Sequence, residues 1–254
     1  MLSQEEYKTY CNTFKAVWRY LKSVSEDNNV VIQNICRYRN YDIERMYDIL
    51  NNIGFIFINK DKFDKRKIAV LSKDYGLMTE SGEFLLTDRF IFPVKDMLGN
   101  IIALIGWYPD EKKYITTPSK LFSKECLFFG MEQLGKVGIG HDFVLVEGIF
   151  DCISVQSLGL NCIAQMGIAT SRYKETLYSL FRRIVAIPDA DTEGRKVVAQ
   201  DKWKLPVSGR YFRWSGTQGI KDIDDLIRNY ESEDVKELLL EVFNETDRVV
   251  TVKL

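Results

Sequence analysis

Two short apolar runs that end abruptly in acidic residues constrain the fold of this chain more than any other feature. Residues 143–146 are followed at once by Glu147, and residues 184–187 are followed by Asp189 and Asp191. Such runs of β-branched and aliphatic residues are typical of buried strands in a parallel sheet that is covered on both faces. We therefore expect an α/β fold in which these acids stand at the carboxyl ends of strands, where open α/β sheets bind ligands.

The three acids predict a cation site at that edge. Glu147, Asp189 and Asp191 would face one another if their strands are neighbours, and three carboxylates in one crevice repel each other unless cations lie between them. Mg²⁺ is the expected cation, because it takes hard oxygen ligands and is usually shared with substrate phosphates. The alternative is that these are ordinary strand-end residues, since Asp and Gly both favour turns.

The acids also belong to a two-part motif. Its parts are Val146-Glu147-Gly148 with Asp151, and Asp189-Ala190-Asp191 with Gly194. A strand ending in Glu-Gly, followed later by a strand ending in Asp-x-Asp, resembles the TOPRIM domain that is shared by DnaG-type primases, topoisomerases and some nucleases. The resemblance implies a TOPRIM α/β domain with a mainly parallel sheet and metal-dependent phosphodiester chemistry.

A wider similarity, from about residue 40 to about residue 230, resembles the catalytic core of DnaG-type primases. Residues 89–99 resemble the Arg-x-x-Phe-Pro-Ile-x-Asp-x-x-Gly element of that family, and residues 113–130 resemble its Lys-Tyr-x-Asn-Ser-Pro, Phe-x-Lys and Leu-Tyr-Gly run. Residues 221–225 resemble its Lys-Asp-Pro-Asp-Glu segment. One departure is that residues 105–108 read Ile-Gly-Trp-Tyr where the family usually has Gly-Gly-Arg, so one expected cationic contact to the template is absent.

The resemblance implies two sets of site residues. The expected catalytic residues are Glu147, Asp189 and Asp191, and the expected ligands of Mg²⁺ or Mn²⁺ are Glu147, Asp189, Asp191, Asp222, Asp224 and Asp151. The residues expected to hold template or nucleotide phosphates are Arg89, Lys113 and Lys124. The alternative for this segment is that Asp224 or Asp225 merely starts a helix over residues 225–230, since acids are favoured at helix starts in any case.

Composition excludes several other classes. The chain has 254 residues, a formal net charge of −1 and no apolar run long enough to span a membrane. Neither zinc nor a disulfide framework is expected, because the five cysteines form no Cys-x-x-Cys pair. A single histidine, His141, discourages a serine-type triad. We expect a cytoplasmic protein. Because the chain carries no strong net charge, binding to nucleic acid would have to depend on a local group of basic residues.

The resemblance, together with the pattern of apolar residues, implies an α+β N-terminal primase-core subdomain over residues 1–138 and a TOPRIM domain over residues 139–230. A C-terminal helix and tail are expected over residues 231–254. Thr192 is the expected cap of a helix that runs past Trp203 and stops before Pro206. The stretch from residue 60 to residue 67 reads as a solvated basic loop, and residues 248–252 as an edge strand.

These observations favour a DnaG-like primase core, a nucleotidyltransferase that makes short RNA primers on single-stranded DNA from ribonucleoside triphosphates. The alternatives are a TOPRIM metal-dependent nuclease and a non-catalytic replication accessory that binds single-stranded DNA or nucleotides. In DnaG-type primases a zinc-ribbon domain precedes the core and a helicase-docking domain follows it, and neither is expected from this sequence. This architecture suggests a phage or mobile-element protein acting in a bacterial cell. A replicative helicase, or a zinc-ribbon partner in trans, is a further expectation, and no membrane partner is expected.

Overall fold

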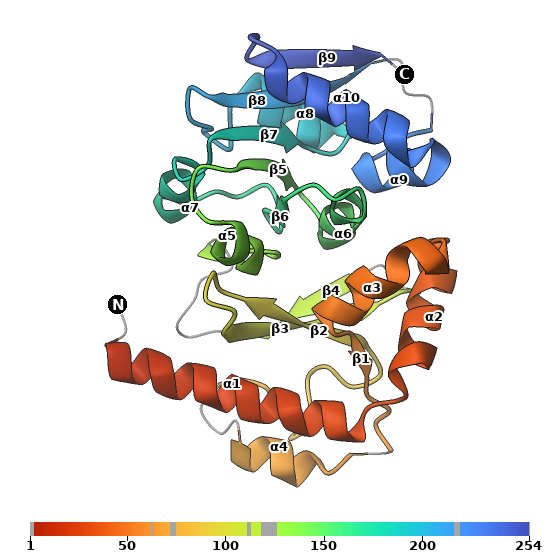
Figure 1. Ribbon diagram of the computed structural model, residues 1–254. Helices are drawn as coiled ribbons and strands as arrows, with labels where there is room; N and C mark the ends of the chain where they lie inside the picture. The colour runs from red at the N-terminus through yellow and green to blue at the C-terminus, as the bar shows by residue number, and fades with distance from the viewer. Residues whose placement is uncertain are drawn as a thin grey trace. The chain divides into compact units, whose positions relative to one another are not determined.

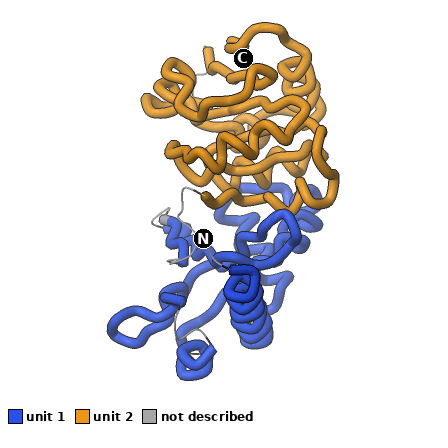
Figure 2. The backbone as a smooth tube through the Cα atoms, turned by 90° about the vertical axis from the view of Figure 1, so that its left-hand side faces the viewer, with its two compact units in different colours: residues 1–123 blue, residues 124–254 orange. Residues whose placement is uncertain are grey.

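The computed structural model describes residues 3–61, 63–71, 75–110, 113–117, 126–215 and 219–253, and the chain divides into two compact units, residues 1–123 and 124–254 (Figure 2). The division falls earlier than the boundary expected at residue 138. The reason is that the segment after residue 126 packs into the second unit. There Phe129 forms a β-bridge with Ala164, while Phe128 and Leu134 join the hydrophobic core.

Unit 1 combines helices with an antiparallel sheet of order β1-β2-β3-β4 (Figure 1). Its elements are α1 (Gln4–Val24), α2 (Asn28–Arg39), α3 (Ile43–Ile53), β1 (Ile56–Phe57), α4 (Lys65–Leu71), β2 (Phe90–Lys95), β3 (Ile101–Tyr108) and β4 (Lys113–Thr116). The prediction of a loop over residues 60–67 is therefore wrong for its last three residues, because α4 already begins at Lys65. The predicted hairpin is confirmed, with β2 and β3 joined through Gly99 at a φ of 79°.

Helix α1 packs on β3 because its apolar residues recur at helical spacing. Tyr10, Phe14 and Leu21 are buried on one stripe of the helix. The hydroxyl of Tyr10 donates to the carbonyl of Ile102 in β3 at 2.7 Å, so this buried polar atom is satisfied. A capping box between Ser3 and Glu6 fixes the start of the helix.

Unit 2 is an α/β domain built on a five-stranded parallel sheet of order β6-β5-β7-β8-β9. Its elements are α5 (Glu132–Val137), β5 (Asp142–Val146), α6 (Ile149–Ser157), β6 (Cys162–Ala164), α7 (Arg172–Tyr178), β7 (Arg183–Ile187), α8 (Thr192–Ala199), β8 (Gly209–Ser215), α9 (Ile223–Asn229), α10 (Ser232–Asn244) and β9 (Val249–Lys253). The fold class expected from the sequence is confirmed.

Helices cover both faces of this sheet, which is why its central strands are apolar on both sides. The core on one face takes Leu145 and Ala186 from β5 and β7, together with Leu134, Leu177 and Val197 from α5, α7 and α8. On the other face α6 contacts β5 and β6, and α10 contacts β7 and β8. In Figure 1, α10 lies in front of the sheet and α8 behind it. The central strands are buried throughout, as the continuous apolar runs predicted.

Two helix boundaries differ from expectation. Asp191, not Thr192, caps α8: its Oδ1 accepts from the backbone N–H of Gly194 at 2.7 Å. An Asp carboxylate is a strong N-cap, and here it stands one residue before the expected cap. The same helix ends at Ala199, because Asp201 and Lys204 take left-handed backbone angles that no α-helix continues.

The C-terminal segment completes the sheet. Strand β9 pairs in parallel with β8 along five residues, from Tyr211 opposite Val249 to Ser215 opposite Lys253. This confirms the expected edge strand and places the segment within the same unit as the TOPRIM-like strands. None of the helices in the described part of the chain combines the length and the apolar character needed to cross a membrane.

At the amino edge of the sheet, a carboxylate is held by two guanidinium groups. Asp142 accepts hydrogen bonds from Arg182 and Arg183, whose Nε atoms lie 2.9 and 3.1 Å from its Oδ1. Burial by itself would raise the pKa of Asp142. The hydrogen bonds and charges of the two arginines outweigh burial and hold that pKa well below its ordinary value.

We therefore predict that Asp142→Asn lowers the stability of the protein at pH 7 by about 1 kcal/mol, since the arginine partners are partly exposed. A depressed folded-state pKa stabilises the fold above the unfolded value of about 4, and the contribution is lost as pH falls. Thermal unfolding from pH 8 down to about pH 2 should show the gap between the two proteins narrowing below about pH 4, as the Asp142 contribution begins to be lost. A constant gap across that range would contradict the ion-pair account.

Candidate metal centre at the carboxyl edge of the parallel sheet

The sequence-predicted acids meet where the strand order of the sheet reverses. The chain runs from β5 to β6 on one side and then returns to β7 on the other side of β5. In parallel register, Val146 lies opposite Ile187 at the carboxyl ends of the two strands. Glu147 follows Val146 directly and Asp189 follows Ile187 after one residue, Pro188, so both acids flank the switch point at which doubly wound sheets bind ligands.

Glu147 and Asp189 are half-buried and mutually repulsive. Burial, followed by the charges of Asp191 and Glu193, raises the pKa of Glu147 to about 7. Burial, followed by the charges of Glu147, Asp222, Asp191 and Asp225, raises the pKa of Asp189 to about 8. Shifts of this kind are expected where like charges share a site without a compensating cation.

Asp191 and Asp222 hold the two loops of the site through helix caps. Asp191 Oδ1 caps α8 and Asp222 Oδ1 caps α9, the latter through the N–H of Asp225 at 2.7 Å. The N–H of Ala190 donates to the carbonyl of Lys221 at 2.7 Å, which ties the Asp189–Asp191 loop to the segment that carries Asp222. The sequence placed the helix start at Asp224 or Asp225, but α9 begins at Ile223 and its cap is Asp222. The metal-binding role of Asp222 stays a prediction.

Each motif glycine permits a close approach that a side chain would block. A Cβ on Gly194 would lie 2.0 Å from the carbonyl oxygen of Asp189, so α8 starts directly against the backbone of that residue. A Cβ on Gly148 would lie 2.4 Å from Asp151 Oδ2, which accepts from the Gly148 N–H at 3.1 Å. The glycines thus set the positions of the acids rather than supply turn flexibility.

Asp151 and Asp224 form a buried network beneath the edge. Asp151 Oδ1 accepts from the N–H of Asp224 at 3.3 Å, and burial followed by neighbouring carboxylates raises the pKa of Asp151 well above its ordinary value. The carboxylate of Asp224 is fully buried and accepts from Ser154 Oγ and from Arg228 Nε, the latter at 3.2 Å. The described contacts of Asp224 are thus to neighbouring side chains beneath the edge.

Sequence reasoning missed Ser154 and Arg228. Arg228 lies four residues after Asp224 on α9, a spacing that favours an ion pair on one helix face, so this partner was predictable. Ser154 lies seventy positions from Asp224 in the chain and carries no motif, so only the contact between α6 and α9 reveals it.

The donor set fits a hard divalent cation in part. The acids at the edge offer carboxylate oxygens, the ligands that Mg²⁺ prefers, and the raised pKa values of Glu147 and Asp189 show the repulsion that a cation would relieve. Within the residues that the structure describes, however, no three His, Cys, Asp or Glu side chains are arranged so that they could hold a metal ion.

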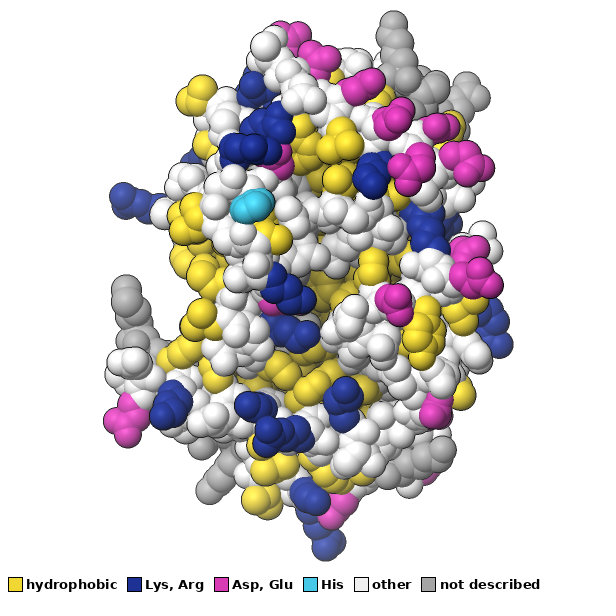
Figure 3. Space-filling view, viewed as in Figure 1, with side chains coloured by type: hydrophobic (Ala, Val, Ile, Leu, Met, Phe, Trp, Pro, Cys, Tyr) yellow, Lys and Arg dark blue, Asp and Glu magenta, His cyan; other side chains and the backbone are white. Residues whose placement is uncertain are grey.

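The expected phosphate-binding residues belong to unit 1 or to the junction. Arg89 is partly buried, and its Cζ lies 5.5 Å from the ring centroid of Tyr108. Among the described residues, its buried Nε and Nη1 atoms have no hydrogen-bond partner. The side chain of Lys113 and the whole of Lys124 lie outside the described residues. On the face of unit 1 in Figure 3, Lys and Arg side chains are interspersed with apolar ones, whereas acidic side chains gather over α9 and α10 of unit 2.

Comparison with known proteins identifies relatives of this chain. Residues 144–227 match the protein family described as Toprim-like. The chain is 32% identical over 146 residues to a DNA primase of Clostridium acetobutylicum and 35% identical over 175 residues to one of Pseudomonas putida. The matches cover 56% and 61% of this chain but 24% and 26% of the two relatives, so the chain spans about a quarter of their length.

Solved structures extend the likeness to nearly the whole chain. A DnaG primase catalytic domain bound to single-stranded DNA matches with a TM-score of 0.74 at 17% identity, over 95% of this chain and 83% of that one. A DNA primase domain from Pseudomonas aeruginosa matches with a TM-score of 0.69 at 24% identity, over 92% of this chain and 78% of that one. The resemblance inferred from the sequence is confirmed, and the fold is that of the DnaG catalytic core.

We predict that Gly194→Ala destabilises the protein by about 2 kcal/mol or more, because its Cβ would overlap the Asp189 carbonyl. The same change at an uncrowded helix position stabilises by up to about 1 kcal/mol, so the sign itself is the test. Chemical denaturation of the two proteins would measure it. A stabilised variant would show that α8 does not pack against Asp189.

A second prediction concerns the repulsion between the acids. In the presence of a chelator, Asp189→Asn should raise the melting temperature at pH 8, because the folded-state pKa of about 8 lies above the unfolded value and ionised Asp189 destabilises the fold. The advantage should shrink as pH falls toward about 4, where the wild-type carboxyl is protonated in both states. Equal melting temperatures at pH 8 would mean that Asp189 feels no net repulsion.

Proposed function

We propose that this chain, which carries a Toprim domain within the fold of the DnaG primase catalytic core, joins ribonucleotides into short primers on a single-stranded DNA template. The observation that carries the proposal is that Glu147, Asp189 and Asp191 follow the carboxyl ends of the two strands that flank the switch point of the sheet. The similarity to DNA primases supports it, and makes the nuclease and the non-catalytic alternatives less favoured. Because the chain spans only part of those relatives, the activity remains a proposal.

The proposed reaction is attack of a primer 3′-hydroxyl on the α-phosphate of a nucleoside triphosphate, with release of pyrophosphate. Such displacements need the two oxygens held in line and the developing negative charge neutralised, and bound Mg²⁺ or Mn²⁺ supplies that neutralisation. Glu147, Asp189 and Asp191 are the residues that would hold the ions, with Asp222 beside them. Asp151 and Asp224, which the sequence also predicted as ligands, lie beneath the carboxyl edge of the sheet. There they would support the metal ligands indirectly, because their hydrogen bonds hold α6 against α9.

The chain's own contribution is to keep charged oxygens in place before substrate arrives. The Asp191 and Asp222 caps and the Ala190 to Lys221 hydrogen bond hold the acid-bearing loops on rigid helix starts. Acids fixed in this way need little rearrangement when charge develops, which is the condition for effective electrostatic catalysis.

The template proposal rests on unit 1. Arg89 is partly exposed, and its guanidinium lies 5.5 Å from the ring centroid of Tyr108; a guanidinium can hold a phosphate through charge-assisted hydrogen bonds. One of the structural relatives is a DnaG domain bound to single-stranded DNA, which supports the same ligand here. Contacts from Lys113 and Lys124, ribonucleoside triphosphates as substrates, a helicase or zinc-ribbon partner, a phage origin and a cytoplasmic location remain predictions from the sequence.

The decisive experiment incubates the protein with single-stranded DNA, labelled ribonucleotides and Mg²⁺ or Mn²⁺. We expect Glu147→Gln, Asp189→Asn and Asp191→Asn each to reduce primer synthesis by at least about a hundredfold, since each removes a carboxylate that would hold the cations neutralising the developing negative charge. Product length on denaturing gels is the measurement, and melting temperatures confirm that the variants fold.

A matched control is Glu237→Gln, which removes an exposed carboxylate on α10. It should leave synthesis unchanged. Cleavage of the DNA in place of extension would support the nuclease alternative, and retention of DNA without reaction would support the binding protein. Wild-type yield from any of the three acid variants would remove that residue from the site.

A further inference from the structure

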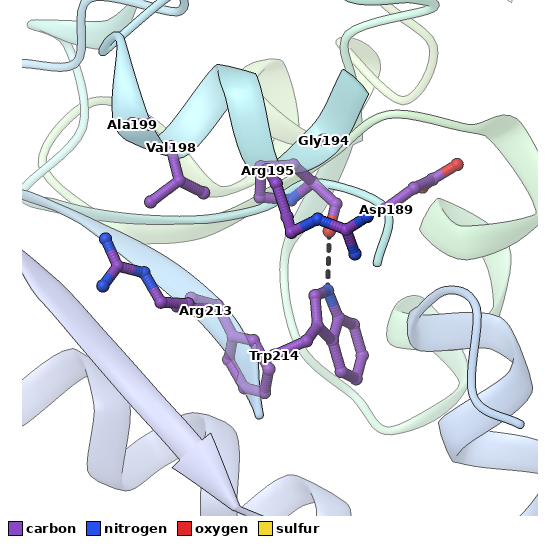
Figure 4. Close-up of a pocket in the computed structure, with 9 residues that line it drawn as sticks. Asp189, Gly194, Arg195, Val198, Ala199, Arg213 and Trp214 are labelled. Carbon is purple, nitrogen blue, oxygen red and sulfur yellow. Dashed lines mark hydrogen bonds between the residues drawn. The ribbon is translucent and has the colours of Figure 1, made fainter. Parts of the chain in front are cut away.

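A pocket in unit 2 lies beside the candidate metal centre without being part of it. Its volume is about 280 Å³, and it lies between α8 and the end of β8 (Figure 4). Pro188 and Asp189 line one end of it. In Figure 4 the carboxylate of Asp189 points away from the other lining side chains, so the pocket and the acidic edge share a backbone segment rather than a side chain.

One wall of the pocket is a fixed aromatic surface. The Nε1–H of Trp214 donates to the carbonyl of Pro188 at 2.7 Å, which sets the orientation of the indole. Behind it, the ring of Phe212 is fully buried, and the two ring centroids lie 4.8 Å apart. Val198 of α8 lines the pocket as well. A flat, partly exposed indole with its N–H already satisfied is suited to stack on a planar ligand.

The charged groups of the pocket are mainly cationic. Arg195 donates from Nη1 to the carbonyl of Ala190 at 2.7 Å and from Nη2 to Thr192 Oγ1 at 3.2 Å, so its guanidinium is held beside the Asp189 loop. Arg213 is exposed, and the structure gives it no hydrogen bond or ion pair within the described residues. By contrast, Arg228 and Arg248 are paired with carboxylates.

We infer that this pocket binds the base and sugar of a nucleotide whose phosphates extend past Arg195 toward the acidic edge. The combination of a stacking surface with guanidinium groups matches a ligand that has a planar ring and an anionic end. The volume lies near the low end for small-molecule sites, which suits one nucleoside rather than a strand of nucleic acid. The inference deepens the proposed function, on which it rests for assigning the ligand as the incoming ribonucleoside triphosphate.

The test measures nucleotide binding separately from polymerisation. Calorimetry with α,β-methylene-ATP and Mg²⁺, without template, gives the affinity of wild type and of Trp214→Leu. We expect about a tenfold loss in Trp214→Leu, the order of one base–aromatic stack. Trp214→Phe should retain most of the affinity, because it keeps an aromatic ring for stacking although it loses the hydrogen bond to Pro188. Arg195→Gln should also weaken binding severalfold.

The matched control is Arg172→Gln, which removes an exposed arginine of α7, a helix that supplies no lining residue to this pocket. Its affinity should equal that of wild type. In primer synthesis, Trp214→Leu should raise the KM for ribonucleotides with kcat largely kept, which a loss of folding would not produce.

The outcomes separate the pocket from the proposed function. Unchanged affinity and KM in Trp214→Leu, in a protein that makes primers, would overturn the assignment of this pocket as a nucleotide site and leave the proposed primase activity in place. Binding that depends on Trp214, in a protein that makes no polymer, would support the pocket and count against the primase. A loss confined to single-stranded DNA binding would also overturn the nucleotide assignment.

Discussion

Repulsion among carboxylates at one edge of a parallel sheet is the constraint on which the rest of unit 2 depends. Glu147 and Asp189 carry raised pKa values because burial and neighbouring acids both disfavour their charged forms. A fold tolerates such a cluster only where the surrounding backbone is firmly held. Here the hold comes from two helix caps, a backbone hydrogen bond between the loops and a core that covers both faces of the sheet.

The glycines of the motif acquire a physical meaning in this setting. Gly194 brings the first turn of α8 into contact with the Asp189 carbonyl, and Gly148 brings the start of α6 against the Asp151 carboxylate. Each therefore connects a helix start to a charged residue at a distance that no Cβ allows. The motif is a packing arrangement as well as a set of ligands, which explains why acids and glycines occur together in it.

The acids beneath the edge have a different environment from those on it. Asp224 is fully buried against Ser154 and Arg228, whereas Glu147 and Asp189 are half-buried and face other acids. The guanidinium of Arg228 offsets part of the charge of Asp224, although Asp224 still contributes to the raised pKa of Asp151. The network joins α6 to α9 and thereby sets where Asp222 stands, so mutations at Arg228 would act on the edge from a distance.

The sequence alone determined the parallel strands, the order of the acids and the helix periods, because these depend on local apolar patterns and turn chemistry. It also predicted the edge strand after residue 248 and the hairpin through Gly99. Only tertiary structure decided that Asp191 caps α8, that the second unit begins after Ser123, that Asp224 meets Ser154, and that Trp214 and Arg195 border one pocket. These features join residues far apart in the chain or depend on competition between neighbouring caps, and no local pattern records which contact prevails.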